Sequence, residues 1–269
     1  MIKKDISKII EKDHVKFISV CFVDALGQLR SKLINKRKVI DALNKDGKGL
    51  TIALPSLALG YCDTQVEISG FSSNKDKFGD IPAKLDFDSL RILPFENEGQ
   101  NLICFIELED EYKSFCSRSI LKKILNKANK QDLYPRFGVE LEFTLLDETS
   151  KSIKNKSYNN LSTTTLESSY NLLQRQNLQS EIYNNFINFS EIMKIEVEAW
   201  HEEMGAGFME VALLSGKTIK SADDTILVKH LIKQIALRHD KVATFMARWS
   251  NDADGHSGHI HISLENGKK

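Results

Sequence analysis

The chain has 269 residues, of which 41% are hydrophobic and 28% are charged, as is typical of a globular protein of one or two domains. Lysine plus arginine and aspartate plus glutamate both number 37, so the net charge gives no reason to expect a nucleic-acid partner. No apolar run approaches transmembrane length and the four cysteines have no paired spacing, so we expect no membrane segment and a location in the reducing cytoplasm.

The first hundred residues predict a small α+β domain. Isoleucines at helical spacing indicate an amphipathic helix over residues 2–10. β-branched and aromatic side chains predict a strand at 15–23, which a Gly-containing turn joins to a hairpin partner at 29–34. Asn35 is expected to cap the helix that follows. After that helix we expect loops and short pieces over residues 47–88. Two strands should follow, over residues 90–95 and 102–108.

From residue 117 onward, helical patterns alternate with strand patterns. Ser117 is expected to cap a helix with apolar residues on one side. The polar stretch 148–165 is expected to be a long, mobile surface loop. Ser221 resembles the first residue of a capping box that opens a long helix. The other predicted elements are helices at 166–177 and 180–193 and strands at 139–145, 195–200, 208–214 and 242–246.

Two strand-like segments carry acids or imidazoles on one side and apolar residues on the other. Alternate residues of a strand face opposite sides, so Glu140 and Glu142 share one face. By the same rule His259, His261 and Ser263 share a face in the last segment. The apolar residues opposite them, which we expect to be buried, are Ile260, Ile262 and Leu264. We therefore expect the two strands to form adjacent walls of one polar cavity.

Two further segments add carboxylates to this set. They are His201-Glu202-Glu203 and Met209-Glu210-Val211, in which an apolar context leaves Glu210 in need of a partner. Each motif alone has an ordinary explanation, a solvated strand face or an acidic loop. Together, four glutamates and one or two histidines offer mostly hard oxygen ligands, which favours Mg²⁺ or Mn²⁺ over a closed zinc site. Carboxylates held close together also need cations between them, or some stay protonated.

The loop from Asp254 to Gly258 offers backbone N–H groups that can bind an anion, and the alternative is a flexible connection. The sequence contains no Walker A motif and no G-x-G-x-x-G motif. No Ser/His/Asp or Cys/His catalytic order stands out.

The order of these motifs resembles the glutamine synthetase family. The motifs are E-x-E, then V-E-A-W-H-x-E, a Gly-containing turn to a further Glu, A-T-F-M, and G-x-x-G-H-x-H-x-S-L. The resemblance also covers Phe22–Gly27, Gly79–Ile81, Leu90–Pro94 and Ser117-Arg118-x-x-Leu121. It implies an α+β fold, with a β-grasp N-terminal domain at residues 1–110. A catalytic domain at 111–269 follows, with a curved antiparallel sheet, flanking helices and an incomplete C-terminus.

The resemblance also implies roles for individual residues. Glu142, Glu203 and Glu210 correspond to ligands of a first metal that organises the glutamate site. Glu140 and His259 correspond to ligands of a second metal beside the ATP phosphates. Gly255 corresponds to a backbone position that meets the substrate amino acid, and His261 and Ser263 fall on the nucleotide side. Asp24 corresponds to an acid that the N-terminal domain lends to a neighbouring subunit, where it helps to deprotonate ammonium.

The implied activity is ATP-dependent formation of a γ-glutamyl amide through a γ-glutamyl phosphate, with two Mg²⁺ or Mn²⁺ ions. The implied partners are glutamate, ATP, ammonia or a small amine, and further copies of the chain in stacked rings with sites between subunits. The sequence departs from the family pattern where Phe208 replaces a usual Gln and Asp254 a frequent Asn. The short spacing from Glu203 to Glu210 is common in relatives that use amines other than ammonia, which leaves the acceptor open.

Two alternatives remain at the level of sequence. One is a catalytically silent or truncated homologue that binds nucleotide, metal or partner subunits, since the arginines and the flap glutamate of the family cannot be located. The other is an unrelated metal-dependent hydrolase that uses the same carboxylate–histidine cluster.

Overall fold

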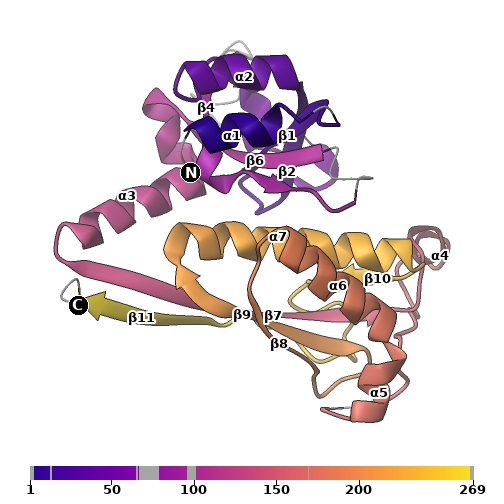
Figure 1. Cartoon of the computed structure of the whole chain (residues 1–269). Helices are drawn as coiled ribbons and strands as arrows, with labels where there is room; N and C mark the ends of the chain where they lie inside the picture. Colours follow the sequence, from indigo (N-terminus) through magenta and orange to yellow (C-terminus); the bar gives the residue numbers. More distant parts are fainter. Residues whose placement is uncertain are drawn as a thin grey trace. The chain divides into compact units, whose positions relative to one another are not determined.

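The computed structural model describes residues 3–12, 14–64, 66, 79–95, 101–168 and 170–266. The chain forms two compact units, Met1–Gln131 and Asp132–Lys269 (Figure 1). The predicted domain boundary between residues 110 and 111 stays a prediction, because compactness alone does not test where a family domain begins. Among the described residues, no helix has the length and apolar character needed to span a membrane.

The first unit combines a six-stranded mixed sheet with helices. Its elements are α1 (Lys3–Ile10), β1 (Phe17–Val23), β2 (Leu29–Asn35), α2 (Lys36–Asn44), β3 (Leu50–Ala53), β4 (Asp80–Leu85), β5 (Arg91–Ile92), β6 (Asn101–Leu108) and α3 (Ser117–Asn129). The strand order is β2-β1-β6-β4-β3, and β5 also pairs with β6. The predicted hairpin of β1 and β2 is confirmed, and β1 pairs with β6 in parallel. The β-grasp assignment of this unit stays a prediction.

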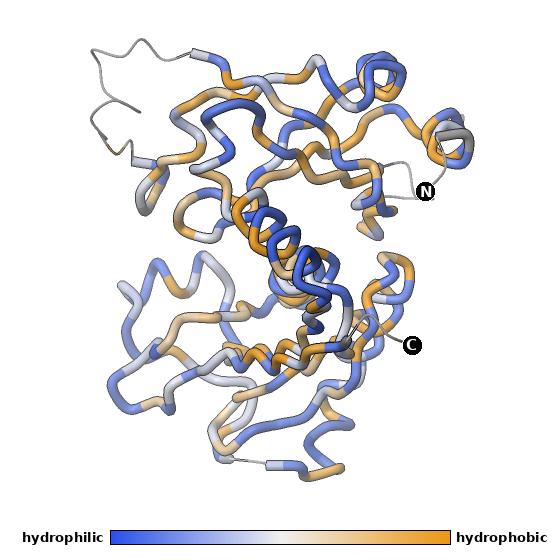
Figure 2. The backbone as a smooth tube through the Cα atoms, turned by 90° about the vertical axis from the view of Figure 1, so that its left-hand side faces the viewer, coloured by the Kyte–Doolittle hydropathy of each residue, from blue (hydrophilic) through white to orange (hydrophobic). Residues whose placement is uncertain are grey.

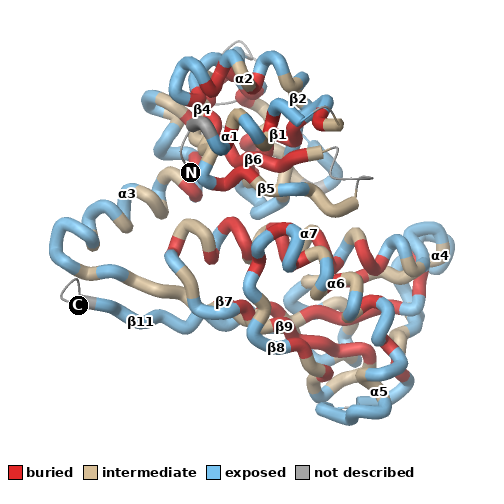
Figure 3. Tube along the Cα trace, in the orientation of Figure 1, coloured by how far each residue is buried: buried red, intermediate tan, exposed pale blue. Residues whose placement is uncertain are grey.

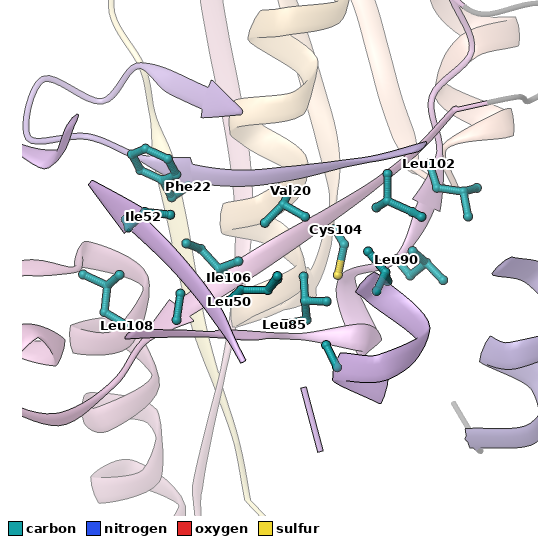
Figure 4. Close-up of a cluster of buried hydrophobic side chains, with 14 of the residues drawn as sticks. Val20, Phe22, Leu50, Ile52, Leu85, Leu90, Leu102, Cys104, Ile106 and Leu108 are labelled. Atoms are coloured by element: carbon teal, nitrogen blue, oxygen red, sulfur yellow. The ribbon is translucent and has the colours of Figure 1, made fainter. Parts of the chain in front are cut away.

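The core of the first unit consists mostly of aliphatic side chains from its strands and from α1 and α2. Figure 4 shows part of this core, with Val20, Leu50 and Ile106 among the labelled residues. Ile6 and Ile10 of α1 are buried in it, as their spacing predicts, whereas residue 2 lies outside the described residues. Asn35 caps α2 as predicted, because its side-chain oxygen accepts a hydrogen bond from the Arg37 backbone N–H at 2.9 Å. The amphipathic pattern therefore accounts for both helices.

The second unit is built on an antiparallel sheet with flanking helices, which confirms the predicted architecture. Its elements are β7 (Leu133–Leu146), α4 (Ser150–Asn155), α5 (Leu173–Leu178), α6 (Ser180–Ile192), β8 (Val197–Glu202), β9 (Phe208–Lys217), α7 (Thr218–Arg238), β10 (Val242–Thr244) and β11 (Ile260–Asn266). The strand order is β10-β7-β9-β8. β11 pairs with the N-terminal half of β7, and β10 pairs with its C-terminal end.

One face of this sheet is apolar and covered by a helix. Val139, Leu141, Phe143 and Leu145 of β7 are all buried, as strand parity predicts. α7 packs against β7, β9 and β10 and also contacts α6 (Figure 1). Hydrophobic and hydrophilic segments alternate along the chain in both units (Figure 2). Because this face is closed by α7, the glutamates of β7 must lie on the opposite face.

The apolar side of β11 departs from the prediction. Ile260, Ile262 and Leu264 are 62%, 64% and 60% exposed, although we expected them to be buried. Figure 3 shows the whole strand as exposed. The strand pairs with β7 at an edge of the sheet, so parity sorts its side chains correctly. Parity predicts which side chains share a face, but it does not predict whether another element covers that face. Here α7 packs on β7, β9 and β10.

Two predicted helix caps, at Ser117 and Ser221, are wrong. The cap of α3 is Cys116, not Ser117, and no side chain caps this helix. α7 begins at Thr218, so Ser221 lies inside its first turn. The Ser221 hydroxyl instead donates to the carbonyl oxygens of Phe137 and Lys217. A serine can bond backward to a carbonyl as readily as it caps, and sequence does not distinguish the two.

The predicted mobile loop at 148–165 contains the helix α4 and a buried acid. Thr149 and Ser152 form a reciprocal capping box at the start of α4. The Glu148 carboxylate accepts hydrogen bonds from Lys156, Ser152 and the Ser162 backbone, which lower its pKa to about 2. These bonds close the segment into an ordered turn. The helix predicted at 166–177 is also shorter, because Ser168 pairs with Ala206 and keeps its surroundings out of the helix.

A matched pair of leucine substitutions tests the difference between the two strands. Leu145→Ala removes a fully buried side chain and should lower the free energy of unfolding by about 2–5 kcal/mol. Leu264→Ala removes an exposed one and should change it by less than about 0.5 kcal/mol. Urea unfolding followed by the fluorescence of the buried Trp200 measures both. A large loss in Leu264→Ala would show that the β11 side chains are covered after all.

Candidate metal centre

Strand register brings the four predicted segments together on one face of the second unit's sheet. Glu210 of β9 is paired with Glu142 of β7 on one side and with His201 of β8 on the other. Across the other edge of β7, the Glu140 N–H donates to the carbonyl oxygen of His259 at 3.0 Å. Paired residues project to the same side of a sheet, so these side chains converge. The two strands therefore lie side by side in one sheet, and the polar cavity that we expected them to enclose stays a prediction.

The first ligand group consists of Glu140, Glu210 and His259, whose candidate ligand atoms all lie within 4.8 Å of one another. His259 Nδ1 is 3.1 Å from Glu140 Oε2. His261 Nε2 lies 3.1 Å from the other oxygen of Glu140. His261 thus touches this group without belonging to it.

The second ligand group consists of His201, Glu203 and Glu210, again with candidate ligand atoms within 4.8 Å of one another. His201 Nε2 is 3.0 Å from Glu203 Oε1 and 3.7 Å from Glu210 Oε1. Sequence reasoning assigned no role to His201. The signal was available, because His201 and Glu203 are two residues apart at a strand end and share a face.

The turn that joins Glu203 to Glu210 depends on a glycine. Gly207 has a φ of +64°, and a Cβ atom there would lie 2.6 Å from the Leu145 carbonyl oxygen. The Glu203 backbone N–H donates to the Phe208 carbonyl oxygen at 2.9 Å, which closes the turn. The backbone therefore fixes the separation of the two glutamates.

Glu142 stays outside both groups among the described residues. Its carboxylate accepts hydrogen bonds from the Ser257 backbone N–H at 2.6 Å and from the Ser257 hydroxyl. This arrangement ties β7 to the loop that contains Gly255. The assignment of Glu142 as a ligand of the first metal stays a prediction.

Burial and like charge both act on the carboxylate that the two groups share. Burial raises the pKa of Glu210, and the neighbouring carboxylates of Glu140, Glu203 and Glu142 raise it further. His201 acts in the opposite direction. Cations bound on both sides of the Glu210 carboxylate, which the two groups share, would offset this repulsion. The donor set of carboxylate oxygens and one imidazole per group fits Mg²⁺ or Mn²⁺, which leave further positions to water or phosphate.

The remaining predicted residues lie in three places. Ser263 follows His261 on the exposed strand β11, and Gly255 lies in the loop that leads to His259. Asp24 belongs to the first unit, where its carboxylate is fully buried. It accepts hydrogen bonds from the Leu26 and Gln28 backbone and from Arg30 Nε at 2.8 Å. The roles of these three residues stay predictions.

A cavity of about 690 Å³ adjoins the metal centre on the same face of the sheet. Its wall includes Thr144 and Phe208, which are paired with each other two residues beyond the pair Glu142 and Glu210. His256 lies behind this wall, with its ring centroid 4.9 Å from that of Phe208 and its Nε2 2.7 Å from Thr144 Oγ1. Burial lowers the pKa of the His256 imidazole. Sequence reasoning did not find this cavity.

Comparison with known proteins agrees with this geometry. A family model described as "Glutamine synthetase, catalytic domain" matches residues 114–269. Type-1 glutamine synthetase 2 of Dictyostelium discoideum is 30% identical over 246 residues, covering 91% of this chain and 46% of that protein. Glutamate–isopropylamine ligase of Pseudomonas sp is 28% identical over 266 residues, covering 97% of this chain and 58% of that protein.

Solved structures show the same fold at lower sequence identity. The structure titled "Apo GmaS without ligand" has a TM-score of 0.80 and 21% identity, and the match covers 97% of this chain and 57% of that one. A Plasmodium falciparum glutamine synthetase structure has a TM-score of 0.75 and 19% identity, and the match covers 100% of this chain and 55% of that one. The chain spans about half the length of the relatives it matches.

Substitution of single glutamates should separate the two metal positions. Electron paramagnetic resonance should count two bound Mn²⁺ ions per chain in the wild type. Glu140→Gln should lose one ion and Glu203→Gln the other, while Glu210→Gln should weaken both by at least about tenfold. Glu198→Gln, at an exposed position of β8, is the matched control and should bind normally. Equal binding by Glu210→Gln and Glu198→Gln would rule out the shared ligand.

The stability of Glu210→Gln relative to the wild type should depend on whether metal is present. In EDTA at pH 7, Glu210→Gln should melt above the wild type, because it removes a carboxylate whose ionised form is disfavoured by burial and by its neighbours. Mn²⁺ at 100 times its Kd should stabilise the wild type by about 2.7 kcal/mol per site and the variant by less. Thermal unfolding tests both halves, and an unchanged order of melting temperatures would contradict the repulsion argument.

Proposed function

Because the chain belongs to the glutamine synthetase family, we propose that it is a carbon–nitrogen ligase that joins glutamate to ammonia or another amine at the expense of ATP. The observation that supports this most strongly is the convergence of five predicted or newly found ligands on one sheet face. The names of relatives, which refer to glutamine, isopropylamine and putrescine, support an acceptor from the class of amines. The product would be a γ-glutamyl amide.

The two ligand groups would hold the two divalent metals of this reaction. Glu140, Glu210 and His259 would hold one, and His201, Glu203 and Glu210 the other. Bound there, Mg²⁺ or Mn²⁺ supplies charge neutralisation for the phosphates and aligns them with the attacking carboxylate. Ser257 orients the Glu142 carboxylate. On this proposal Glu142 and Glu203 also border the glutamate, since they adjoin the Gly255 loop and the Gly207 turn.

The remaining assignments of the proposal concern the substrates. The Gly255 backbone would meet glutamate, and His261 and Ser263 would lie on the nucleotide side. A γ-glutamyl phosphate is then attacked by an amine that has lost its proton, since a protonated amine has no lone pair. Asp24 remains the proposed acid that assists deprotonation in a neighbouring subunit. A homo-oligomer with sites between subunits and a cytoplasmic location belong to the same proposal.

Transfer of oxygen from glutamate to phosphate tests this chemistry directly. The product of the complete reading frame should cleave ATP only when glutamate, an amine and Mg²⁺ or Mn²⁺ are all present. With glutamate labelled by ¹⁸O in its γ-carboxylate, one label should appear in the released phosphate. Glu142→Gln should lower turnover about 100-fold or more with an unchanged far-ultraviolet circular dichroism spectrum.

The outcomes of this experiment also separate the alternatives. If the protein binds metal but cleaves no ATP in the presence of any amine, a homologue without turnover is favoured. Hydrolysis of an amide or ester without ATP would favour a metal-dependent hydrolase. Loss of folding in Glu142→Gln, with unchanged specific activity of the soluble fraction, would assign that residue a structural role.

A further inference from the structure

The first unit carries a groove of about 480 Å³ in which most of the lining side chains are cationic. We propose that this groove binds a small soluble anion that carries two or more phosphate groups. The groove belongs wholly to residues 107–130, so the proposal does not depend on the metal centre or on the proposed ligase function. The cations of this lysine groove are Lys113, Lys122, Lys123, Lys127 and Lys130.

Positive charge is concentrated in the lysine groove although the chain as a whole is neutral. Basic and acidic residues both number 37, yet the groove combines five lysines with the single acid Glu107. Lys123, Lys127 and Lys130 follow one another at i, i+4 and i+7 in α3 and its C-cap, so they lie along one face of the helix. Like charges at this spacing repel each other. A bound anion would offset this repulsion.

The acids beside the lysine groove are already paired with other cations. Arg118 Nη2 donates to Asp86 Oδ2 at 2.6 Å, and Lys122 Nζ donates to the same oxygen at 2.7 Å. Glu107 Oε1 accepts hydrogen bonds from the same two side chains. Two acids therefore balance two cations. Four lining cations form no ion pair with any described residue, and they are Lys113, Lys123, Lys127 and Lys130.

A buried hydroxyl in the lining adds a directed contact. Ser119 lies in the first turn of α3 and lines the lysine groove. Its Oγ atom is shielded from solvent and has no hydrogen-bond partner in the described ranges of the chain. A buried hydroxyl that makes no hydrogen bond lowers stability. A phosphate oxygen in the groove would accept the Ser119 hydrogen bond and remove this cost.

The size and charge of the lysine groove indicate the class of ligand. Its volume of about 480 Å³ falls within the range of about 300–1,000 Å³ of small-molecule sites. A phosphate group carries about 1.5–2 negative charges at pH 7, so two such groups match the four ammonium groups that lack an acid. Lysine binds phosphate as a point charge. Among the described lining residues there is no aromatic ring on which a nucleobase could stack.

Isothermal titration calorimetry with sodium pyrophosphate tests this inference. The titration is run in EDTA, because the carboxylates of the metal centre then repel a phosphate instead of binding it through a cation. The wild type should bind one pyrophosphate per chain, and inorganic phosphate should bind at least about fivefold more weakly. Lys123→Gln combined with Lys127→Gln should weaken pyrophosphate binding about tenfold. Ser119→Ala should weaken it about fivefold and leave the net charge unchanged.

A charge-matched control separates the groove from the net charge of the chain. Lys32→Gln combined with Lys38→Gln removes two exposed lysines elsewhere in the first unit and should bind as the wild type does. Far-ultraviolet circular dichroism verifies that each variant is folded.

Three results of the titration would overturn the inference. The first is the lack of saturable pyrophosphate binding by the wild type. The second is equal weakening by the two double-lysine variants, which would show that overall charge attracts the anion. The third is binding of a hexaglutamate peptide as tightly as pyrophosphate, which would assign the lysine groove to an acidic polypeptide instead. Because the titration contains neither metal nor ATP, its outcome is independent of whether the ligase assignment holds.

Discussion

Repulsion between carboxylates held on one face of a sheet is the constraint on which the second unit depends. Glu210 is buried, and its carboxylate is close to those of Glu140 and Glu203. The fold cannot separate them, because cross-strand pairing and a glycine turn fix their backbone positions. A chain gains nothing in stability from such an arrangement unless cations compensate it. We therefore interpret the cluster as a site that cations complete.

The rest of the second unit supports this arrangement. β7 pairs along its length with β9, β10 and β11, so one long strand positions ligands from several distant segments. α7 closes the apolar face of the sheet and leaves the opposite face for polar chemistry. The same register places Phe208 next to Glu210, which links the lining of the cavity to the spacing of the ligands. The wall of the cavity and the spacing of the candidate ligands thus both depend on one strand pairing.

Strand parity made much of this site predictable from sequence. Alternation alone places Glu140 and Glu142 opposite the buried Val139, Leu141 and Phe143, and the structure confirms it. Family resemblance supplied the order of the motifs. His201 received no role of its own, although its spacing of two residues from Glu203 at a strand end places both on one face. The cap at Ser221 was wrong because its serine bonds backward inside the helix, and the cap at Ser117 was wrong because the helix begins at that residue. The cavity was missed because loops remote in sequence line it.

Anomalous X-ray diffraction from crystals soaked with Mn²⁺ would test the central claim most directly. Two anomalous peaks should appear on the polar face of the sheet, one bounded by Glu140, Glu210 and His259 and the other by His201, Glu203 and Glu210. Glu210 should contact both ions. Peaks at unrelated surface acids, or no peak on this face at saturating Mn²⁺, would contradict the account.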